Sequence, residues 1–193
     1  LINFLNQNIL FFRLYHVFWF IVLVSVLKNL FPFSNKYIPS SKMFKKNYKK
    51  SGKKISKQFK RKTDKKAILI LCFWILLVLI IGLLYIYNIF NKLIIYWFVV
   101  FFIFMDQFCI SIMCIFNKLI IKNKCCRTCR IHNWDKFMIV SPLIFLGTFW
   151  DCVLFFSGLI IFIQWEYLYY KYPERFFEIT NKNLLCKNCE ENL

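Results

Sequence analysis

The sequence predicts an all-α integral membrane protein with three or four transmembrane helices. Of its 193 residues, 60% are hydrophobic and 21% are aromatic, which is more apolar than a soluble domain. The apolar residues form four long runs, and most of the 27 Lys and Arg lie between these runs, as in membrane spans joined by basic loops. The net charge of +18 is therefore expected to lie outside the hydrocarbon layer rather than over a soluble surface.

The first predicted transmembrane segment occupies residues 1–31, with its apolar run between Ile9 and Leu30. Arg13 and His16 lie near the start of this run. Long or amphipathic side chains in such places reach the membrane interface, so we interpret both residues as interfacial anchors. A functional intramembrane charge is the alternative interpretation.

Residues 32–66 form a basic loop that contains a single acidic residue, Asp64. This excess of Lys and Arg predicts a position on the cytoplasmic or matrix side. Self-repulsion predicts a solvated segment unless an anionic partner neutralises it. The candidate partners are anionic lipid headgroups, acidic faces of neighbouring subunits, and RNA, although no RNA-binding motif supports RNA. The residues expected to contact lipid or a partner are Lys45, Lys46, Lys49, Lys50, Lys53, Lys54, Lys60, Arg61 and Lys62.

Residues 67–116 are predicted to form a transmembrane helical hairpin. The run from Ala67 to Tyr87 contains no charged residue and has about the length that a bilayer requires. The next run, from Leu93 to Phe116, follows after the short Asn88–Lys92 connection. Such a short connection predicts two antiparallel helices.

Three polar residues are predicted to lie inside the membrane: Asp106 and Gln107 near the middle of the third segment, and Asp151 in the fourth. A carboxylate at that depth needs a partner, a water-filled cavity or a proton. Two interpretations of Asp106 follow. One is a structural or intersubunit salt bridge, and the other is proton or ion handling.

The fourth hydrophobic segment, residues 137–164, is long and is interrupted by Pro142, Gly147 and Asp151. A straight helix of this length would measure about 42 Å, which exceeds the hydrocarbon thickness. The segment is therefore either a tilted, kinked span or two half-length helices in a re-entrant hairpin. Residues 165–193 then form an interfacial aromatic segment and a polar C-terminal tail.

Two C-x-x-C knuckles carry the one chemical motif of the chain. Cys126 and Cys129 lie in the loop of residues 117–136, and Cys186 and Cys189 lie in the C-terminal tail. Two such pairs provide the four sulfur ligands of a structural zinc site, a small zinc-ribbon-like element, and nearby Lys and Arg favour the thiolate form. A dithiol–disulfide pair, an iron–sulfur centre and unpaired thiols are the alternatives.

The zinc interpretation depends on how often residues 137–164 cross the membrane. A single crossing would place the two knuckles on opposite sides, whereas a hairpin would place them together. The interruption between Pro142 and Gly147 permits the hairpin, and the surplus length favours it. We therefore expect both knuckles on the basic side.

The residue usage also indicates the kind of genome that encodes this chain. Ala67 is the only alanine, and 4 Gly and 4 Pro stand beside 25 Phe, which indicates an extremely AT-rich coding genome. The chain opens at Leu1, which suggests a non-standard start codon or a processed end. In these features it resembles mitochondrially encoded membrane proteins of ciliates, although no motif is shared. The resemblance implies the mitochondrial inner membrane, and the plasma membrane of an AT-rich bacterium is the alternative.

The sequence contains no phosphate-binding loop, zinc-hydrolase helix or nucleophile elbow, so no common catalytic motif assigns a function. Three hypotheses from different classes remain. The leading hypothesis is a non-catalytic membrane subunit of a respiratory-chain complex or ATP synthase, in which structural zinc joins the tail to the first knuckle. The second is a membrane thiol–disulfide oxidoreductase, whose general plan resembles the quinone-coupled disulfide-forming proteins. The third is a small proton-handling transporter that uses Asp106 and Asp151.

Overall fold

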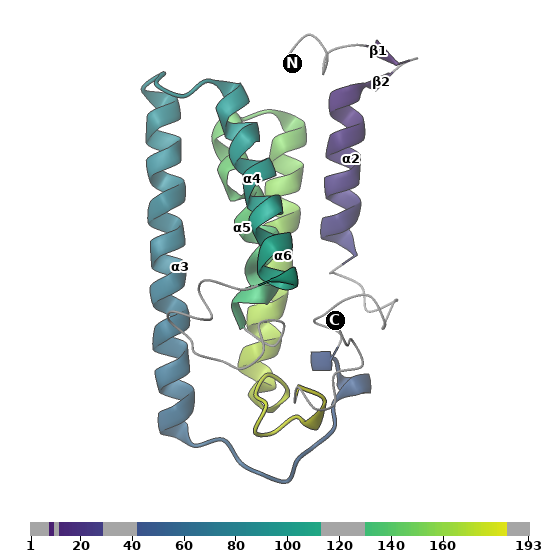
Figure 1. Ribbon diagram of the computed structural model, residues 1–193, viewed down its shortest axis with the longest axis vertical. Helices are drawn as coiled ribbons and strands as arrows, with labels where there is room; N and C mark the ends of the chain where they lie inside the picture. The colour runs from purple at the N-terminus through teal and green to yellow at the C-terminus, as the bar shows by residue number, and fades with distance from the viewer. Residues whose placement is uncertain (1–7, 10–11, 29–41, 113–129, 185–193) are drawn as a thin grey trace.

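The computed structural model describes residues 8–9, 12–28, 42–112 and 130–184, and within them the chain is mostly α-helical (Figure 1). The α-helices are α2 (Leu14–Leu27), α3 (Lys57–Ile86), α4 (Lys92–Ser111), α5 (Asp135–Val140) and α6 (Phe149–Lys171). The short 3-10 helices are η2 (Lys45–Asn47), η5 (Arg130–Trp134), η6 (Ser141–Leu146), η7 (Pro173–Arg175) and η8 (Lys182–Leu184). The two-residue strands β1 (Asn8–Ile9) and β2 (Phe12–Arg13) pair in antiparallel.

Among the described helices, α3, α6 and residues Lys92–Cys109 of α4 are long and apolar enough to cross a membrane. They agree with the predicted class of integral membrane protein. The first predicted segment is represented by α2, which has 14 residues. A helix of that number of residues measures about 21 Å, less than the roughly 30 Å of a hydrocarbon core.

Helix α3 is longer than the apolar run that predicts it. Its 30 residues correspond to about 45 Å, of which the apolar part from Ala67 to Ile86 accounts for about 30 Å. The first ten residues, 57–66, belong to the basic loop in the sequence, yet they continue the same helix. Lys, Arg and Gln are good helix formers, and an adjoining apolar helix removes the need for a separate nucleus.

Helices α3 and α4 are antiparallel, as the short connection predicts. Asn88 takes the left-handed conformation (φ 59°) just after α3 ends, a conformation that Asn tolerates better than most residues. The side chain of Asn91 then accepts a hydrogen bond from the backbone N–H of Ile94 (3.1 Å) and caps α4. Deeper in the hairpin, the rings of Trp74 and Phe102 meet edge to face, with centroids 4.7 Å apart.

Residues 137–164 do not form one straight helix, because the chain reverses at Gly147 (φ 64°). The arm formed by α5 and η6 runs away from the basic end, and α6 returns antiparallel to it. Thr148 caps α6 by accepting a hydrogen bond from the backbone N–H of Asp151 (3.4 Å). The turn therefore lies at Gly147–Thr148 and not at Pro142, which sits near the start of η6, where the backbone N–H that it lacks is not required. The returning arm is a full-length helix and not half of one.

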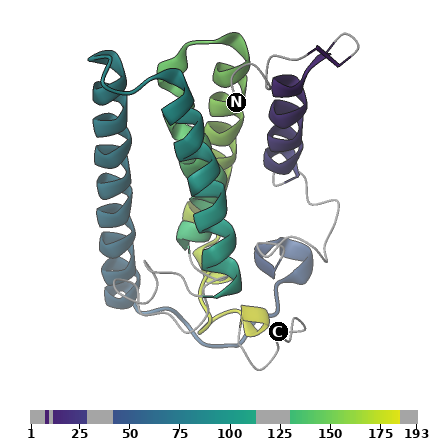
Figure 2. The same ribbon diagram turned by 45° about the horizontal axis from the view of Figure 1, so that its top comes forward.

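Figures 1 and 2 show α3 at one side of the molecule and α2 at the other, with α4, α5 and α6 between them. The arm of α5 packs closely on α6 at Gly158. A Cβ atom at this position would lie 2.6 Å from Val140 Cγ2 and 3.2 Å from Phe137 Cα. Helix α2 contacts the start of α6 through Trp19, whose Nε1 donates a hydrogen bond to the Trp150 carbonyl (2.6 Å).

Candidate functional site

The four knuckle cysteines, Cys126, Cys129, Cys186 and Cys189, lie outside the described residues. Their neighbours are described, however, and these neighbours are at the same end of the molecule. Arg130, which follows the first knuckle, pairs with Asp64 at the basic end of α3 (2.9 Å). Near the second knuckle, the backbone N–H of Lys182 donates to the Lys49 carbonyl in the basic loop (2.8 Å). The reversal at Gly147 thus returns the chain to the side from which Arg130 departs.

Arg130 is the centre of an ion cluster at this basic end. Its guanidinium donates to Asp64 Oδ1 (2.9 Å) and to both carboxylate oxygens of Glu166, with Nε 2.9 Å from Oε1. A bidentate Arg–carboxylate pair is stronger and more directional than a single hydrogen bond. Burial alone would lower the pKa of Arg130, but the hydrogen bonds and charge of Glu166, with a smaller contribution from Asp64, more than offset it and raise that pKa. Arg130 therefore stays charged and joins α3 to α6.

Aromatic side chains complete the Arg130 cluster. The guanidinium carbon lies 4.0 Å from the ring centroid of Tyr169 and 5.4 Å from that of Trp134. The hydroxyl of Tyr169 donates to Asp64 (2.5 Å), and Nε1 of Trp134 donates to Glu166 (2.7 Å). Both carboxylates thus accept hydrogen bonds from more than one donor. This arrangement is typical of an ion cluster that joins helices, not of a carboxylate that accepts and releases protons.

Asp106, predicted as an intramembrane carboxylate, pairs with Lys136. Lys136 Nζ lies 3.3 Å from Asp106 Oδ2 and 2.8 Å from Asp135 Oδ2. The sequence placed Asp106 near the middle of a helix that reached Phe116. Helix α4 instead ends at Ser111, so Asp106 lies in its last two turns. Gln107, beside it, is exposed.

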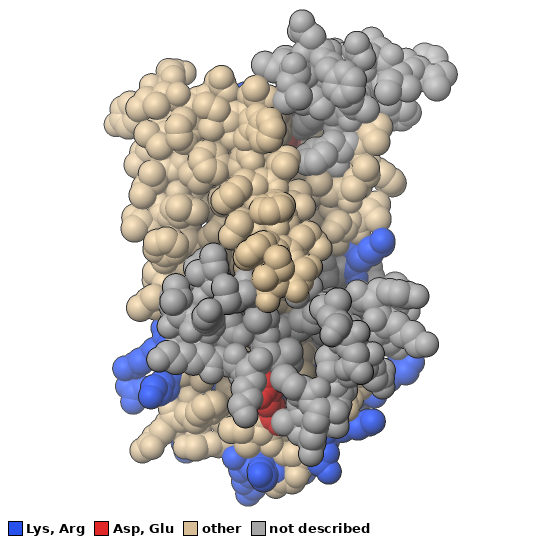
Figure 3. Space-filling view, in the orientation of Figure 1, with Lys and Arg blue, Asp and Glu red and all other residues tan. Residues whose placement is uncertain are grey.

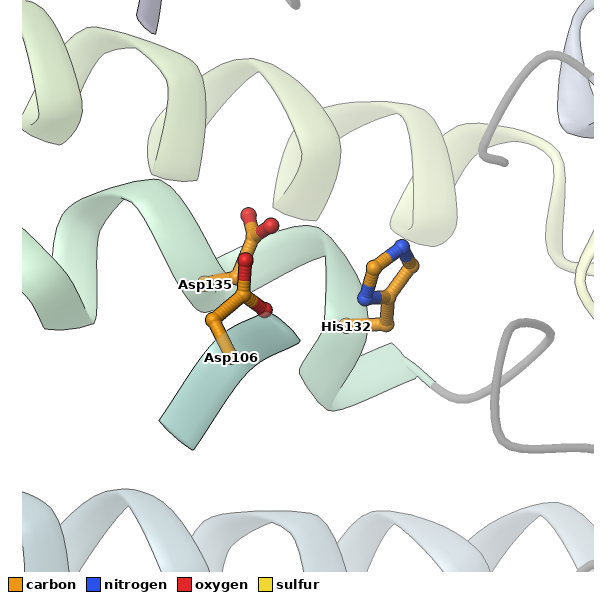
Figure 4. Close-up of side chains that lie close together, drawn as sticks. All are labelled: Asp106, His132 and Asp135. Carbon is orange, nitrogen blue, oxygen red and sulfur yellow. The ribbon is translucent and has the colours of Figure 1, made fainter. Parts of the chain in front are cut away.

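His132 joins the Asp106 pair, and Figure 4 shows the three side chains Asp106, His132 and Asp135 turned toward one another. One ligand atom from each lies within 4.8 Å of the others. Carboxylate and imidazole groups suit several divalent metals. The ammonium of Lys136, however, already lies against both carboxylates. The cluster therefore contains its own counter-charge, and a metal ion would have to displace it.

Asp151, the third predicted intramembrane polar residue, is buried at the start of α6. The hydroxyl of Tyr96 donates to Asp151 Oδ2 (3.1 Å), and the Thr148 hydroxyl donates to the same oxygen. A carboxylate in the first turn also interacts favourably with the positive end of the helix dipole. Asp151 is thus a capping residue that ties α6 to α4. The Thr148-x-x-Asp151 spacing could have revealed this role, because it is close to a capping box.

The C-terminal tail is pinned to the basic loop by Asn181, which is fully buried. Its Nδ2 donates to the carbonyls of Lys42 (3.1 Å) and Arg175 (3.0 Å). Its Oδ1 accepts from the backbone N–H groups of Lys49 (3.4 Å) and Asn183 (3.2 Å). This one amide therefore connects segments more than 130 residues apart, and no sequence pattern indicated it.

Figure 3 shows Lys and Arg gathered over the end of the molecule where α3 begins, while the described surface at the opposite end is mostly uncharged. Among the predicted lipid or partner contacts, Lys60 is half-buried, with Nζ 5.6 Å from the Tyr169 ring centroid. The others are exposed: Lys45, Lys46, Lys49, Lys50, Lys53, Lys54, Arg61 and Lys62. The basic loop thus presents a cationic surface.

No protein-family model matches this chain, and no curated protein or solved structure is detectably similar to it.

Proposed function

We propose that this chain is a non-catalytic integral membrane subunit of a larger assembly, with structural zinc joining its two C-x-x-C knuckles at the basic end. The observation that carries the proposal is the reversal of the chain at Gly147. It returns the chain to the end where Arg130, beside the first knuckle, pairs with Asp64, and where Lys182, four residues before Cys186, bonds to Lys49 of the basic loop. A tetrahedral S₄ zinc site within one chain requires this arrangement.

The internal polar contacts favour a structural role over proton transport. Asp106 pairs with Lys136, and Asp151 accepts hydrogen bonds from Tyr96 and Thr148. A carboxylate that carries protons needs access to water and freedom to change partners. These two carboxylates instead connect neighbouring elements of the fold, so they support packing as the role of both.

The basic end is proposed to face the cytoplasm or the mitochondrial matrix, because Lys and Arg in short loops stay on that side. Its partners in this proposal are anionic lipid headgroups and other membrane subunits. The mitochondrial inner membrane, and a respiratory-chain complex or ATP synthase within it, rest on the AT-rich composition alone. Large apolar side chains on the outer faces of α3 and α4, such as Phe73 (54% exposed) and Trp97 (57%), suit contact with lipid or with neighbouring subunits.

The zinc part of the proposal is tested by elemental mass spectrometry on the detergent-purified protein. We expect about one zinc ion per chain, lost in Cys126→Ser/Cys186→Ser. The matched control is Cys72→Ser/Cys152→Ser, which removes two cysteines from the transmembrane helices and should retain the metal. Absence of metal from the parent protein, with the knuckle cysteines oxidised in pairs, would refute the zinc site and favour a thiol–disulfide oxidoreductase.

The subunit part is tested by native electrophoresis of membranes dissolved in mild detergent. We expect the chain to migrate within a complex much larger than itself, and to leave that complex in the Cys126→Ser/Cys186→Ser variant but not in the control. Migration as a single chain under conditions that preserve the other membrane complexes would contradict the proposal.

A further inference from the structure

The basic end of α3 has an inner face that the chain itself occupies. Lys60 Nζ lies 5.6 Å from the Tyr169 ring centroid, and Asp64 accepts hydrogen bonds from Arg130 and Tyr169. One turn later, Ala67 is buried against the rest of the fold. A ligand can therefore approach these turns only from the opposite side of the helix.

The side of α3 that remains open carries a row of three cations, Lys57, Arg61 and Lys65. They are spaced four residues apart, so they lie one above another on the helix surface. All three are exposed, and none pairs with a carboxylate of the residues that the structure describes. From Lys57 to Lys65 the row covers nine residues, which corresponds to about 12 Å along the helix axis. It therefore presents three adjacent charges without a counter-charge.

The cationic row continues directly into an apolar row on the same side of α3. After Lys65 come Ile68 (53% exposed), Leu76 (56%) and Leu79 (50%). The row from Ile68 to Leu79 measures about 16 Å along the helix axis, which is roughly the thickness of one hydrocarbon leaflet. One face of one helix thus offers positive charge at headgroup depth and an apolar track at acyl-chain depth.

We propose that this face of α3 is a binding site for an anionic phospholipid, and that a headgroup with two phosphates fits it best. The inference rests on the proposed membrane placement of the basic end. Arg61 can bind phosphate in a bidentate manner, and the lysines on either side provide point charges for it or for a second phosphate. An RNA ligand would use the cations but would leave the adjoining apolar row uncovered. A phospholipid uses both.

The test measures lipid binding by native mass spectrometry of the full-length protein in mild detergent. The probes are cardiolipin with two phosphates, phosphatidylglycerol with one, and zwitterionic phosphatidylcholine. We expect binding in that order. Each cation close to an anionic headgroup contributes roughly fivefold in affinity. The variant Lys57→Gln/Arg61→Gln/Lys65→Gln should therefore lose on the order of 100-fold for cardiolipin, and Lys65→Gln alone about fivefold.

The matched control, Lys28→Gln/Lys171→Gln/Lys182→Gln, removes the same charge from exposed positions outside both the row and the predicted lipid contacts of the basic loop. We expect the control to retain most of the affinity. Equal losses in the two triple variants would overturn the site, because they would indicate diffuse attraction to exposed cations in general. An RNA oligonucleotide or inorganic pyrophosphate that binds through the row as tightly as cardiolipin would also overturn it. Zinc content and migration in native gels are measured on the same samples, so a failure of this inference is distinguishable from a failure of the proposed function.

Discussion

Arg130→Gln removes the cation that joins Asp64 of α3 to Glu166 of α6 at the basic end. The substitution abolishes the bidentate pair with Glu166, the ion pair with Asp64 and the stacking on Tyr169. It leaves two carboxylates without their counter-charge. Gln retains much of the side-chain length and one hydrogen-bond donor group, so the change reports mainly on charge and bidentate geometry.

The expected loss follows from the burial of the cluster. Removing one partner of a fully buried ion pair costs about 3–5 kcal/mol. Here the side chains of Arg130, Asp64 and Glu166 are 16%, 28% and 25% exposed, and water will relieve part of that penalty. We therefore expect a loss of about 2–3 kcal/mol from the ionic contacts, with roughly 0.5–1 kcal/mol more from the stacking on Tyr169.

The measurement is the free energy of unfolding in mixed micelles, from a titration with SDS followed by circular dichroism. Arg175→Gln is the control, because its guanidinium stacks on Tyr172 (4.0 Å) and has no carboxylate partner among the described residues. This control should lose about 0.5–1 kcal/mol. Arg130→Gln/Glu166→Gln should lose less than the sum of its single variants, by about 1–2 kcal/mol. Equal losses for Arg130→Gln and the control would refute the view that one ion cluster secures this end.

Three further changes test other contacts by the same titration. Lys136→Met should destabilise the protein by about 2–4 kcal/mol, because it removes the counter-charge that Asp106 and Asp135 share. Asp106→Asn in the same chain should restore part of the loss, and no restoration would show that the two residues are uncoupled. Gly158→Leu should cost about 1–3 kcal/mol, since its Cβ atom would meet Val140 Cγ2 at 2.6 Å, and an unchanged stability would contradict this close approach. Asn181→Ala should expose the C-terminal tail to limited proteolysis while the transmembrane helices stay protected, and cleavage at the parental rate would show that the tail is held by other contacts.

The sequence predicts the helices well because an apolar run of bilayer length has few alternatives in lipid. Ala67–Tyr87 and the run from Leu93 correspond closely to α3 and α4. The ends of the helices are less predictable. Helix α3 begins ten residues before its apolar run, because a chain rich in Lys and Arg can continue a helix as readily as it can form a loop. Hydrophobicity alone does not locate that boundary.

The position of the turn in the fourth segment could have been predicted from the sequence. Pro142 and Gly147 both interrupt the run, and the structure turns at Gly147. Gly-Thr-x-x-Asp combines a residue that suits the left-handed conformation with a helix cap and an acidic first turn. The pattern therefore distinguished the two sites, whereas proline alone did not.

Contacts between side chains of different helices could not be predicted from the sequence, because they depend on the relative register of elements far apart in the chain. Asp106 required a partner by its position in an apolar run. Nothing in the sequence singled out Lys136, which lies 30 residues later and borders the fourth segment. Arg130 was noticeable only for its place beside Cys129. Its two carboxylates come from α3 and α6, which meet only after the chain has reversed.

The small number of acidic residues explains how one chain can have both firm internal ion pairs and a strongly basic surface. The sequence contains 9 Asp and Glu beside 27 Lys and Arg. Asp64, the one acid of the basic loop, is turned inward to Arg130 and Tyr169, so it does not neutralise the lysines around it. An acidic side chain that pairs inside the fold cannot neutralise the Lys and Arg side chains on the surface. The cationic surplus must then be balanced from outside the chain. In the membrane placement that we propose, anionic headgroups at the basic end provide this negative charge.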